Sequence, residues 1–261
     1  MFRRYGLMYA LLFPAVALTF VFHYVPMAGI VMAFQDFDIF KGFGGSPFVG
    51  LQHFSTIVTL PSFTDAIVNT FVYSATLIFL GFPLPIALAL LFNELRSKLF
   101  KKTVQTITYL PYFLSWISVV TLFYAFFAVD GTYNDMKQLL LGASVERTNM
   151  LMDPDYFLPI LFLSHVWKTV GWSTVIFLAA MMSIDAHLYE AAKIDGCGRW
   201  KQALHVTLPG ILPTVMMIFI FSTAGLATAN FEQVYGFQNL YTQTDTEVVT
   251  TLVFREGIQN G

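Results

Sequence analysis

Five long apolar stretches dominate this sequence, and each is long enough to cross a lipid bilayer as a helix. A membrane-spanning helix needs about 20 mostly apolar residues. The apolar runs are continuous, whereas the strands of a transmembrane barrel alternate between apolar and polar residues. The sequence therefore predicts an all-α integral membrane protein, a helical transmembrane bundle with spans at about residues 5–33, 66–92, 103–127, 157–184 and 211–229.

The composition supports a membrane protein. The chain is 56% hydrophobic and 11% charged, with a mean hydropathy of +0.65. A soluble domain carries about twice that charged fraction. The first stretch follows two arginines, as a signal peptide would, but its apolar run continues to about Ala33 without an early small-residue cleavage site. We therefore expect a first span that is retained.

The distribution of Lys and Arg predicts the orientation of the chain. Short cytoplasmic loops carry an excess of these residues. Nine of the 14 basic residues fall in one set of alternating connections: Arg3, Arg4, Arg96, Lys98, Lys101, Lys102, Lys193, Arg199 and Lys201. We therefore expect the N-terminus, the loop at 94–102 and the segment 185–209 to lie in the cytoplasm, and the longer connections to lie outside.

The patterns of common catalytic and cofactor sites are missing from the sequence. It contains no G-x-x-x-x-G-K-[ST] loop for nucleotide phosphates, no H-E-x-x-H zinc motif and no G-x-S-x-G nucleophile. The five histidines are scattered and lack the spacing of metal ligands. The single cysteine, Cys197, permits no internal disulfide. We expect a chain with no enzymatic activity, no metal, no cofactor of its own and no nucleic-acid partner.

A short polar segment between the fourth and fifth spans, "YEAAKIDGCGRWKQALHVTLPG", differs from its surroundings. Asp185 can cap a helix over "HLYEAAK", and Gly196 and Gly198 allow it to stop and the chain to reverse. We expect "RWKQALHV" to form a second short helix that ends at Pro209, before the fifth span begins. The residues alone fit two interpretations. Either this helix–turn–helix docks into a soluble subunit, or it rests on lipid headgroups.

The spacing within this segment resembles the EAA loop of ABC-importer permeases, E-A-A-x3-G-x9-I-x-L-P. Here it reads Glu190-Ala191-Ala192, three residues, Gly196, nine residues, Val206 in place of isoleucine, Thr207, and Leu208-Pro209. Four further stretches are similar to oligosaccharide and polysaccharide permeases of the carbohydrate-uptake branch. They are "HYVPMAGIVMAFQDFDIFKGFGGSPFVGLQHF", "LPYFLSW", "WKTVGW" and "NFEQVYGFQN". The resemblance thus covers most of the chain and favours the docking interpretation.

The resemblance implies a complete importer. Two permease subunits, usually different chains, form the pathway in the bacterial cytoplasmic (inner) membrane. Two ATP-binding-cassette subunits hold ATP and Mg²⁺ below them. A periplasmic or lipid-anchored solute-binding protein delivers the carbohydrate from outside. On this basis, the residues expected to couple the chain to the ATPase are Glu190, Ala191, Ala192, Asp195, Gly196, Leu208 and Pro209.

The resemblance also implies one transmembrane permease domain over residues 1–261. Such permeases usually have six core spans and a cytoplasmic C-terminus. The printed chain ends at Gly261, after five spans, on the side expected to be outside. Either the sequence continues beyond Gly261 or the last helix is missing, and we expect a further span to follow.

Two groups of residues are candidates for contact with substrate. Lys168 is a charge inside the fourth span, flanked by Trp167 and Trp172, whose rings suit sugars. Its alternatives are a structural ion pair or a lysine that snorkels to the interface. The second group, at the outer end of the fifth span, could line a vestibule or simply be loop residues: Asn230, Glu232, Gln233, Gln238 and Asn239.

A self-sufficient, ion-coupled secondary transporter is the alternative function. Such a transporter needs acidic residues buried within its spans to couple protons or sodium. None of the five predicted spans contains an Asp or Glu at mid-depth. The sequence therefore favours the ATP-driven importer. A membrane enzyme is a third alternative, disfavoured by the missing catalytic motifs.

Overall fold

The computed structural model describes the backbone of residues 2–259 and the side chains from Gly6 to Gln259, and this part of the chain is mainly helical without a named strand. It contains five helices long and apolar enough to cross a membrane. The predicted all-α membrane fold is therefore confirmed. The chain divides into two compact units, residues 1–63 and 64–261, which are described separately. Whether they form the single permease domain expected above stays a prediction.

The first unit contains one span followed by a folded loop. Helix α1 (Phe2–Thr19) continues through a π-helical turn, η1 (Phe20–Tyr24), and a 3-10 segment, η2 (Val25–Phe34). The candidate span covers Gly6–Phe34, close to the predicted 5–33. Two short helices follow, α2 (Gly42–Gly45) and α3 (Gln52–Val58).

The second unit is built around the long helix α9 (Phe157–Met182). Helix α4 (Pro61–Thr76), which starts at the boundary between the units, continues through η3 (Leu77–Gly81) into α5 (Pro83–Glu94) as the second span, Pro61–Glu94. Helix α5 packs along α9, and α12 (Leu208–Thr223) packs on α9 as well. One apolar cluster on this frame joins Ala89, Phe177, Met181 and Ile211. A larger one, around α7 and α13, includes Tyr73, Trp116, Val119, Phe123, Leu161, Val234 and Phe237.

The prediction of one continuous third span over 103–127 is wrong. The structure divides it into α6 (Lys98–Tyr109), a 3-10 turn η4 (Leu110–Phe113) and α7 (Trp116–Phe127), and the candidate span starts only at Trp116. Pro111 lacks a backbone N–H, and the helix tightens into a 3-10 turn around it. The helix stops at Leu114, whose backbone is extended, with φ of −74° and ψ of 144°. Ser115 then caps α7, because its Oγ accepts a hydrogen bond from the backbone N–H of Ser118 at 3.2 Å.

The predicted separate helix over "RWKQALHV" is also wrong. Helix α11 (Arg199–Gln202), a π-helical turn η6 (Ala203–Thr207) and α12 form one continuous helix, so the fifth span begins at Arg199 rather than at 211. Pro209 lies in the first turn of α12, where its missing N–H costs little. In the turn before it, the N–H of Leu208 reaches back to the carbonyl of Ala203. This wider turn carries the helix past the proline.

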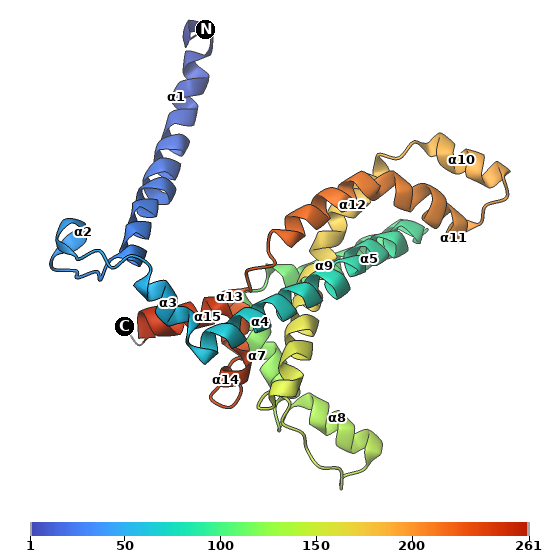
Figure 1. The fold of residues 1–261 in the computed structure, drawn as a ribbon. Helices are drawn as coiled ribbons and strands as arrows, with labels where there is room; N and C mark the ends of the chain where they lie inside the picture. Colours follow the sequence, from blue (N-terminus) through green and yellow to red (C-terminus); the bar gives the residue numbers. More distant parts are fainter. Residues whose placement is uncertain (1, 260–261) are drawn as a thin grey trace. The chain divides into compact units, whose positions relative to one another are not determined.

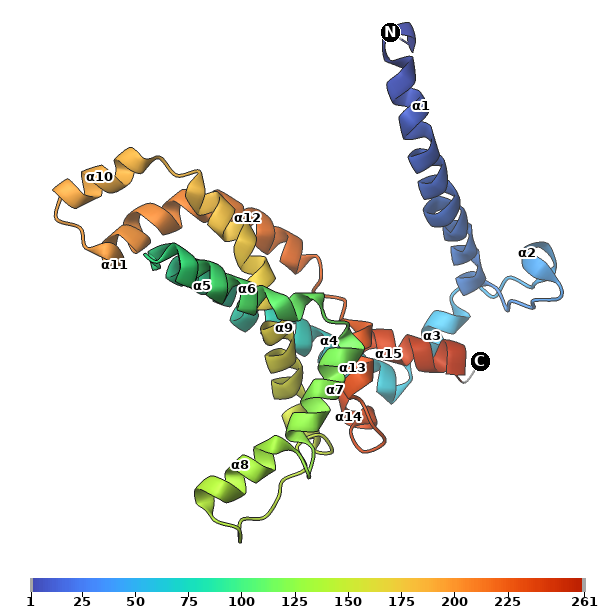
Figure 2. The same ribbon diagram turned by 180° about the vertical axis from the view of Figure 1, so that it is seen from behind.

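The remaining elements lie at the two ends of α9. Helix α8 (Thr132–Leu141) and the turn η5 (Pro154–Tyr156) precede its first residue, and α10 (Ala186–Ile194) follows its last. A helix of 26 residues is about 39 Å long, enough to cross the hydrocarbon core. Helices α8 and α10 therefore lie at opposite ends of this unit, as both views show (Figures 1 and 2).

After α12 the chain continues through four short helical elements. They are α13 (Phe231–Phe237), α14 (Gln243–Thr246), α15 (Val249–Phe254) and η7 (Arg255–Gln259).

Candidate functional site: the coupling segment and a transmembrane groove

Helix α10 forms where the sequence predicts it. The carboxylate of Asp185 accepts a hydrogen bond from the N–H of His187 at 2.9 Å, which caps the first turn. Glu190 lies on the exposed surface, with His187 one turn before it at 3.4 Å as its partner within the helix. Ala191 is exposed, whereas Ala192 is buried. The helix thus presents a carboxylate beside a small side chain, a surface that another backbone can approach closely.

Gly196 ends α10 in a left-handed conformation, with φ of +74°. The N–H of Cys197 donates to the carbonyl of Ala192 at 2.8 Å, and the N–H of Gly196 donates to that of Lys193 at 3.1 Å. This pair of bonds is a Schellman motif, and its αL position favours glycine. Asp195 is the C-cap residue just before it. The predicted reversal at Gly196 is therefore confirmed, and only one residue type adopts it without strain.

Two contacts that sequence reasoning missed hold this segment against the spans. The hydroxyl of Tyr189 lies 3.0 Å from the Oγ1 of Thr207, which links α10 to the foot of α12. The guanidinium of Arg199 lies 3.0 Å from the carboxylate of Glu94, the last residue of α5. Leu208 packs into the apolar cluster around Phe177. The coupling segment is thus joined to two of the helices that pack on α9.

A groove of about 470 Å³ lies between α4–α5, α9 and α12. Its volume is in the range of small-molecule sites. Helix α9 contributes His165, Thr169 and Ser173, which follow one another at intervals of four residues and so share one face. The other polar residues that line the groove come from the neighbouring segments and are Tyr73, Ser74, Ser222, Thr228 and Asn230. The groove therefore offers hydroxyl and amide groups at the middle of a span, beside aromatic and aliphatic walls.

The predicted pathway residues of the fourth span lie outside this groove. Lys168 is 7% exposed, and its ammonium donates to the backbone carbonyls of Tyr112, at 2.8 Å, and Leu114. No carboxylate of the described residues lies within ion-pair distance of it. Trp172 stacks on the Tyr112 ring with 4.8 Å between centroids, and Trp167 packs near Phe123. Contact of these side chains with substrate stays a prediction.

The predicted residues at the end of the fifth span divide into exposed and buried positions. Asn230 caps α13 and lines the groove, and Glu232 is exposed. Gln233 is fully buried, and its amide is bound by Tyr73, Leu161 and Ser164. The side-chain amides of Gln238 and Asn239 bind the carbonyls of Thr246 and Leu151. Asn230 and Glu232 are therefore the exposed members of this group, Gln238 and Asn239 are partly exposed with their amides already bonded, and Gln233 is enclosed.

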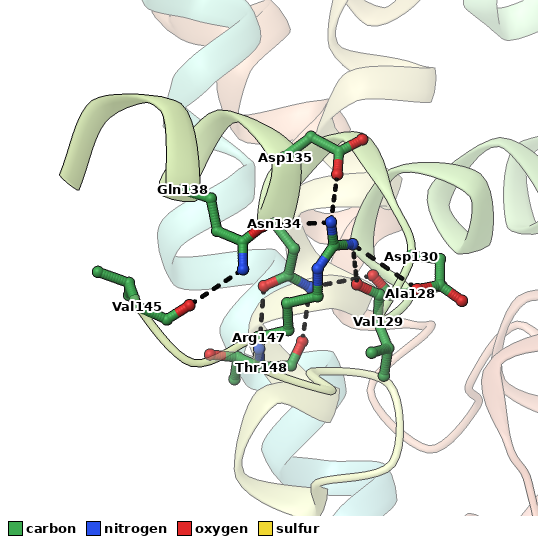
Figure 3. A network of polar contacts seen from close by, with 9 residues as sticks. All are labelled: Ala128, Val129, Asp130, Asn134, Asp135, Gln138, Val145, Arg147 and Thr148. Carbon is green, nitrogen blue, oxygen red and sulfur yellow. Dashed lines mark hydrogen bonds and ion pairs between the residues drawn. The ribbon is translucent and has the colours of Figure 1, made fainter. Parts of the chain in front are cut away.

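An ordered hairpin occupies the end of this unit opposite α10. Arg147 donates to the carboxylate of Asp135 at 2.8 Å and to the carbonyl of Val129 at 3.0 Å, and it lies 3.7 Å from Asp130 (Figure 3). Asn134, fully buried, bonds both ways with the backbone of Thr148, at 2.9 Å each. This network fixes the connection from 128 to 148. Among the described residues, no group of three or more His, Cys, Asp or Glu side chains could hold a metal ion.

Comparison with known proteins decides the family. The model of the binding-protein-dependent transport system inner membrane component matches residues 81–231, more than half of the chain. The chain belongs to this family. It is a permease subunit of an ABC importer, and therefore a non-catalytic, multi-pass protein of the bacterial inner membrane.

Individual relatives match almost the whole permease. The polygalacturonan/rhamnogalacturonan transport system permease protein YteP of Bacillus subtilis is 41% identical over 254 residues, which are 97% of this chain and 78% of the relative. Protein LplB of the same organism is 36% identical over 260 residues, covering 99% and 81%. The comparisons give no support to a secondary transporter.

Solved structures show the same fold. A chain of a bacterial ABC transporter that imports the acidic polysaccharide alginate superimposes with a TM-score of 0.90 at 35% identity, covering 99% of the permease and 86% of that chain. A second structure holds that transporter in complex with an alginate pentasaccharide-bound periplasmic protein, and superimposes with a TM-score of 0.89 at 35% identity.

Proposed function

We propose that this permease and a second, different permease chain form the pathway by which oligosaccharides of an acidic polysaccharide enter the cell, driven by two ATPase subunits. The observation that carries the proposal is the coupling segment, residues 185–209. Its EAA residues lie on a capped, exposed helix that is fixed at its base and leaves Glu190 open to a partner. ATP and Mg²⁺ belong to the partner subunits.

The connection between this segment and the groove explains how nucleotide binding could move the pathway. Helix α12 is continuous with α11, so a displacement of α10 and its turn acts directly on one wall of the groove. The Arg199–Glu94 ion pair acts on α5, which carries part of another wall. Two groove walls therefore respond to one docking site, as required for switching between outward-facing and inward-facing states.

The chemistry of the groove suits a carbohydrate. Hydroxyl and amide groups such as those of Ser173, Ser222 and Asn230 can exchange hydrogen bonds with sugar hydroxyls, and the flanking Phe82 and Phe177 offer apolar surface to sugar rings. The acidic class is proposed from the relatives, two of which are named for polygalacturonan and alginate. We place the N-terminus in the cytoplasm and the α8 hairpin outside, where a solute-binding protein would meet it.

Reversal of one charge of the Arg199–Glu94 pair is expected to lower uptake modestly. Both side chains are about half exposed, and such pairs contribute about 0.2–1 kcal/mol. Arg199→Glu or Glu94→Arg should reduce uptake of labelled oligogalacturonate by no more than about fivefold. The double reversal should restore it. A double variant as slow as the worse single variant would show that the ion pair does not link α11 to α5.

The proposed function is tested by purifying the full-length tagged chain in mild detergent. We expect a P-loop ATPase and a second permease to co-purify in stoichiometric amounts, and the eluate to hydrolyse ATP. Mass spectrometry identifies the partners, and a phosphate-release assay measures the activity. A permease that purifies alone, without ATPase activity, would contradict the proposal.

A further inference from the structure

A buried lysine closes the break between α6 and α7. Lys168 lies in the middle of α9, and its ammonium donates to the backbone carbonyls of Tyr112 and Leu114, both within the break. It also lies over the rings of Tyr112 and Trp116, at 5.5 Å and 5.4 Å from their centroids. The lysine is 7% exposed, so this is an enclosed site rather than a surface contact.

The break needs such a donor because it contacts Lys168 in the middle of α9, a membrane-spanning helix, and so lies at the depth of the hydrocarbon core. An α-helix would pair the carbonyl of Leu114 with the N–H of Ser118, but that N–H donates to the side chain of Ser115 instead. A backbone carbonyl left without a partner in hydrocarbon costs several kcal/mol. A lysine ammonium offers three donors and no acceptor, so one side chain can satisfy two carbonyls at once.

Two neighbours of Lys168 pack on the break and on the end of α6 just before it. Gly171 faces the carbonyl oxygen of Thr108, and a Cβ atom at this position would lie 2.1 Å from that oxygen. Trp172 stacks on Tyr112 with an interplanar angle of 11°. Within about one turn of α9, the stretch "WKTVGW" thus supplies the ammonium of Lys168 and the ring of Trp172 to the break, while Gly171 leaves room for the end of α6.

The break in turn supports the wall of the groove. Trp116 begins α7 and is 8% exposed. Its ring stacks on His165, with 6.1 Å between centroids and an angle of 27°. His165 lines the groove. A shift of the break would therefore move Trp116 and, through it, a side chain of the groove.

We propose that Lys168 is a positioning residue for transport, which satisfies the backbone of the broken third span and thereby fixes Trp116 and His165 at the groove. It is not a ligand for the sugar in this conformation, because it is buried, lies outside the groove lining and gives two of its three donors to carbonyls. The transport readout rests on the proposed function, whereas the structural readout below does not.

The test compares Lys168→Met with Lys168→Arg in the assembled complex in nanodiscs, without sugar. Lys168→Met keeps an unbranched side chain but removes the donors, so hydrogen exchange of the backbone amides in 110–118 should become at least about fivefold faster. Lys168→Arg keeps two or more donors and should recover much of the protection. With oligogalacturonate, Lys168→Met should lower the maximal uptake rate more than it changes the half-saturating concentration.

Unchanged exchange at 110–118 together with a raised half-saturating concentration would overturn the proposal and identify Lys168 as a ligand for the acidic sugar. If Lys168→Met does not assemble, Lys168→Gln, which is shorter and offers a single amide, replaces it and should show faster exchange at 110–118 than Lys168→Arg. Trp172→Leu tests the packing of the break separately. It removes the stack on Tyr112 without removing a charge and should accelerate exchange in the same residues. The matched control Trp167→Leu, which removes a ring packed near Phe123 instead, should not. If the unmodified importer shows no uptake of oligogalacturonate, that result counts against the proposed function only. The hydrogen-exchange result for Lys168 does not depend on transport, because it is measured without sugar.

Discussion

The substitution Gly196→Val is expected to reduce ATP-driven uptake by about 5- to 30-fold or more. A residue other than glycine in the left-handed region costs about 1–2 kcal/mol, and a β-branched side chain fits there worst. A cost of that size lowers the population of the required conformer by about 5- to 30-fold. The Schellman bonds from Gly196 and Cys197 depend on this conformer, and they set where α10 points.

The ATPase activity distinguishes a coupling defect from a folding defect. Gly196→Val should still insert and co-purify with its partners, because no heavy atom lies within 4 Å of the added Cβ. Its ATP hydrolysis should become independent of the solute-binding protein. Gly198→Val is the matched control, since the same side chain meets open space on extended backbone with φ of −67°. Equal losses in both variants would show that side-chain bulk in this turn, and not the αL conformation, limits transport.

The first, second and fourth spans and the coupling helix could be predicted from the sequence because their signals are local. Continuous apolar runs give the spans, while Asp185 and Gly196 give the two ends of α10. The polar face of the groove was also present, as His165, Thr169 and Ser173 recur every four residues in an apolar span. That stripe could have been found from the sequence, and the prediction instead favoured the single charge at Lys168.

The break in the third span could not be predicted from its proline alone. Pro83 and Pro209 also lie in spans, yet a π-helical turn precedes each of them and the helix continues. At Pro111 the outcome depends on Ser115, which captures a backbone N–H, and on Lys168, which binds the carbonyls left over. Every residue has a backbone carbonyl, so the sequence does not show which carbonyls lack a partner and bind the lysine. The burial of Gln233 likewise depends on three partners distant along the chain.

Ser173→Trp is expected to block the pathway while the coupling remains intact. Ser173 faces the groove from the middle of α9, and an indole there would fill a large share of the 470 Å³ volume. Making room for the sugar beside this ring should cost about 1–3 kcal/mol, the range for overpacking, so uptake of oligogalacturonate should fall by about 5- to 150-fold. The substitution leaves α10 and its contacts through Tyr189 and Arg199 unchanged. ATP hydrolysis should therefore still respond to the solute-binding protein, unlike that of Gly196→Val.

The matched control is Val175→Trp, two residues along the same helix and outside the groove lining. It adds a comparable ring to a position that is 37% exposed and should retain most of the uptake. Loss of uptake in Val175→Trp as well would mean that α9 tolerates no added ring. The result for Ser173→Trp would then not identify the groove as the path of the sugar. Loss in Ser173→Trp alone, with ATP hydrolysis still stimulated, would separate the path of the sugar from the segment that drives it.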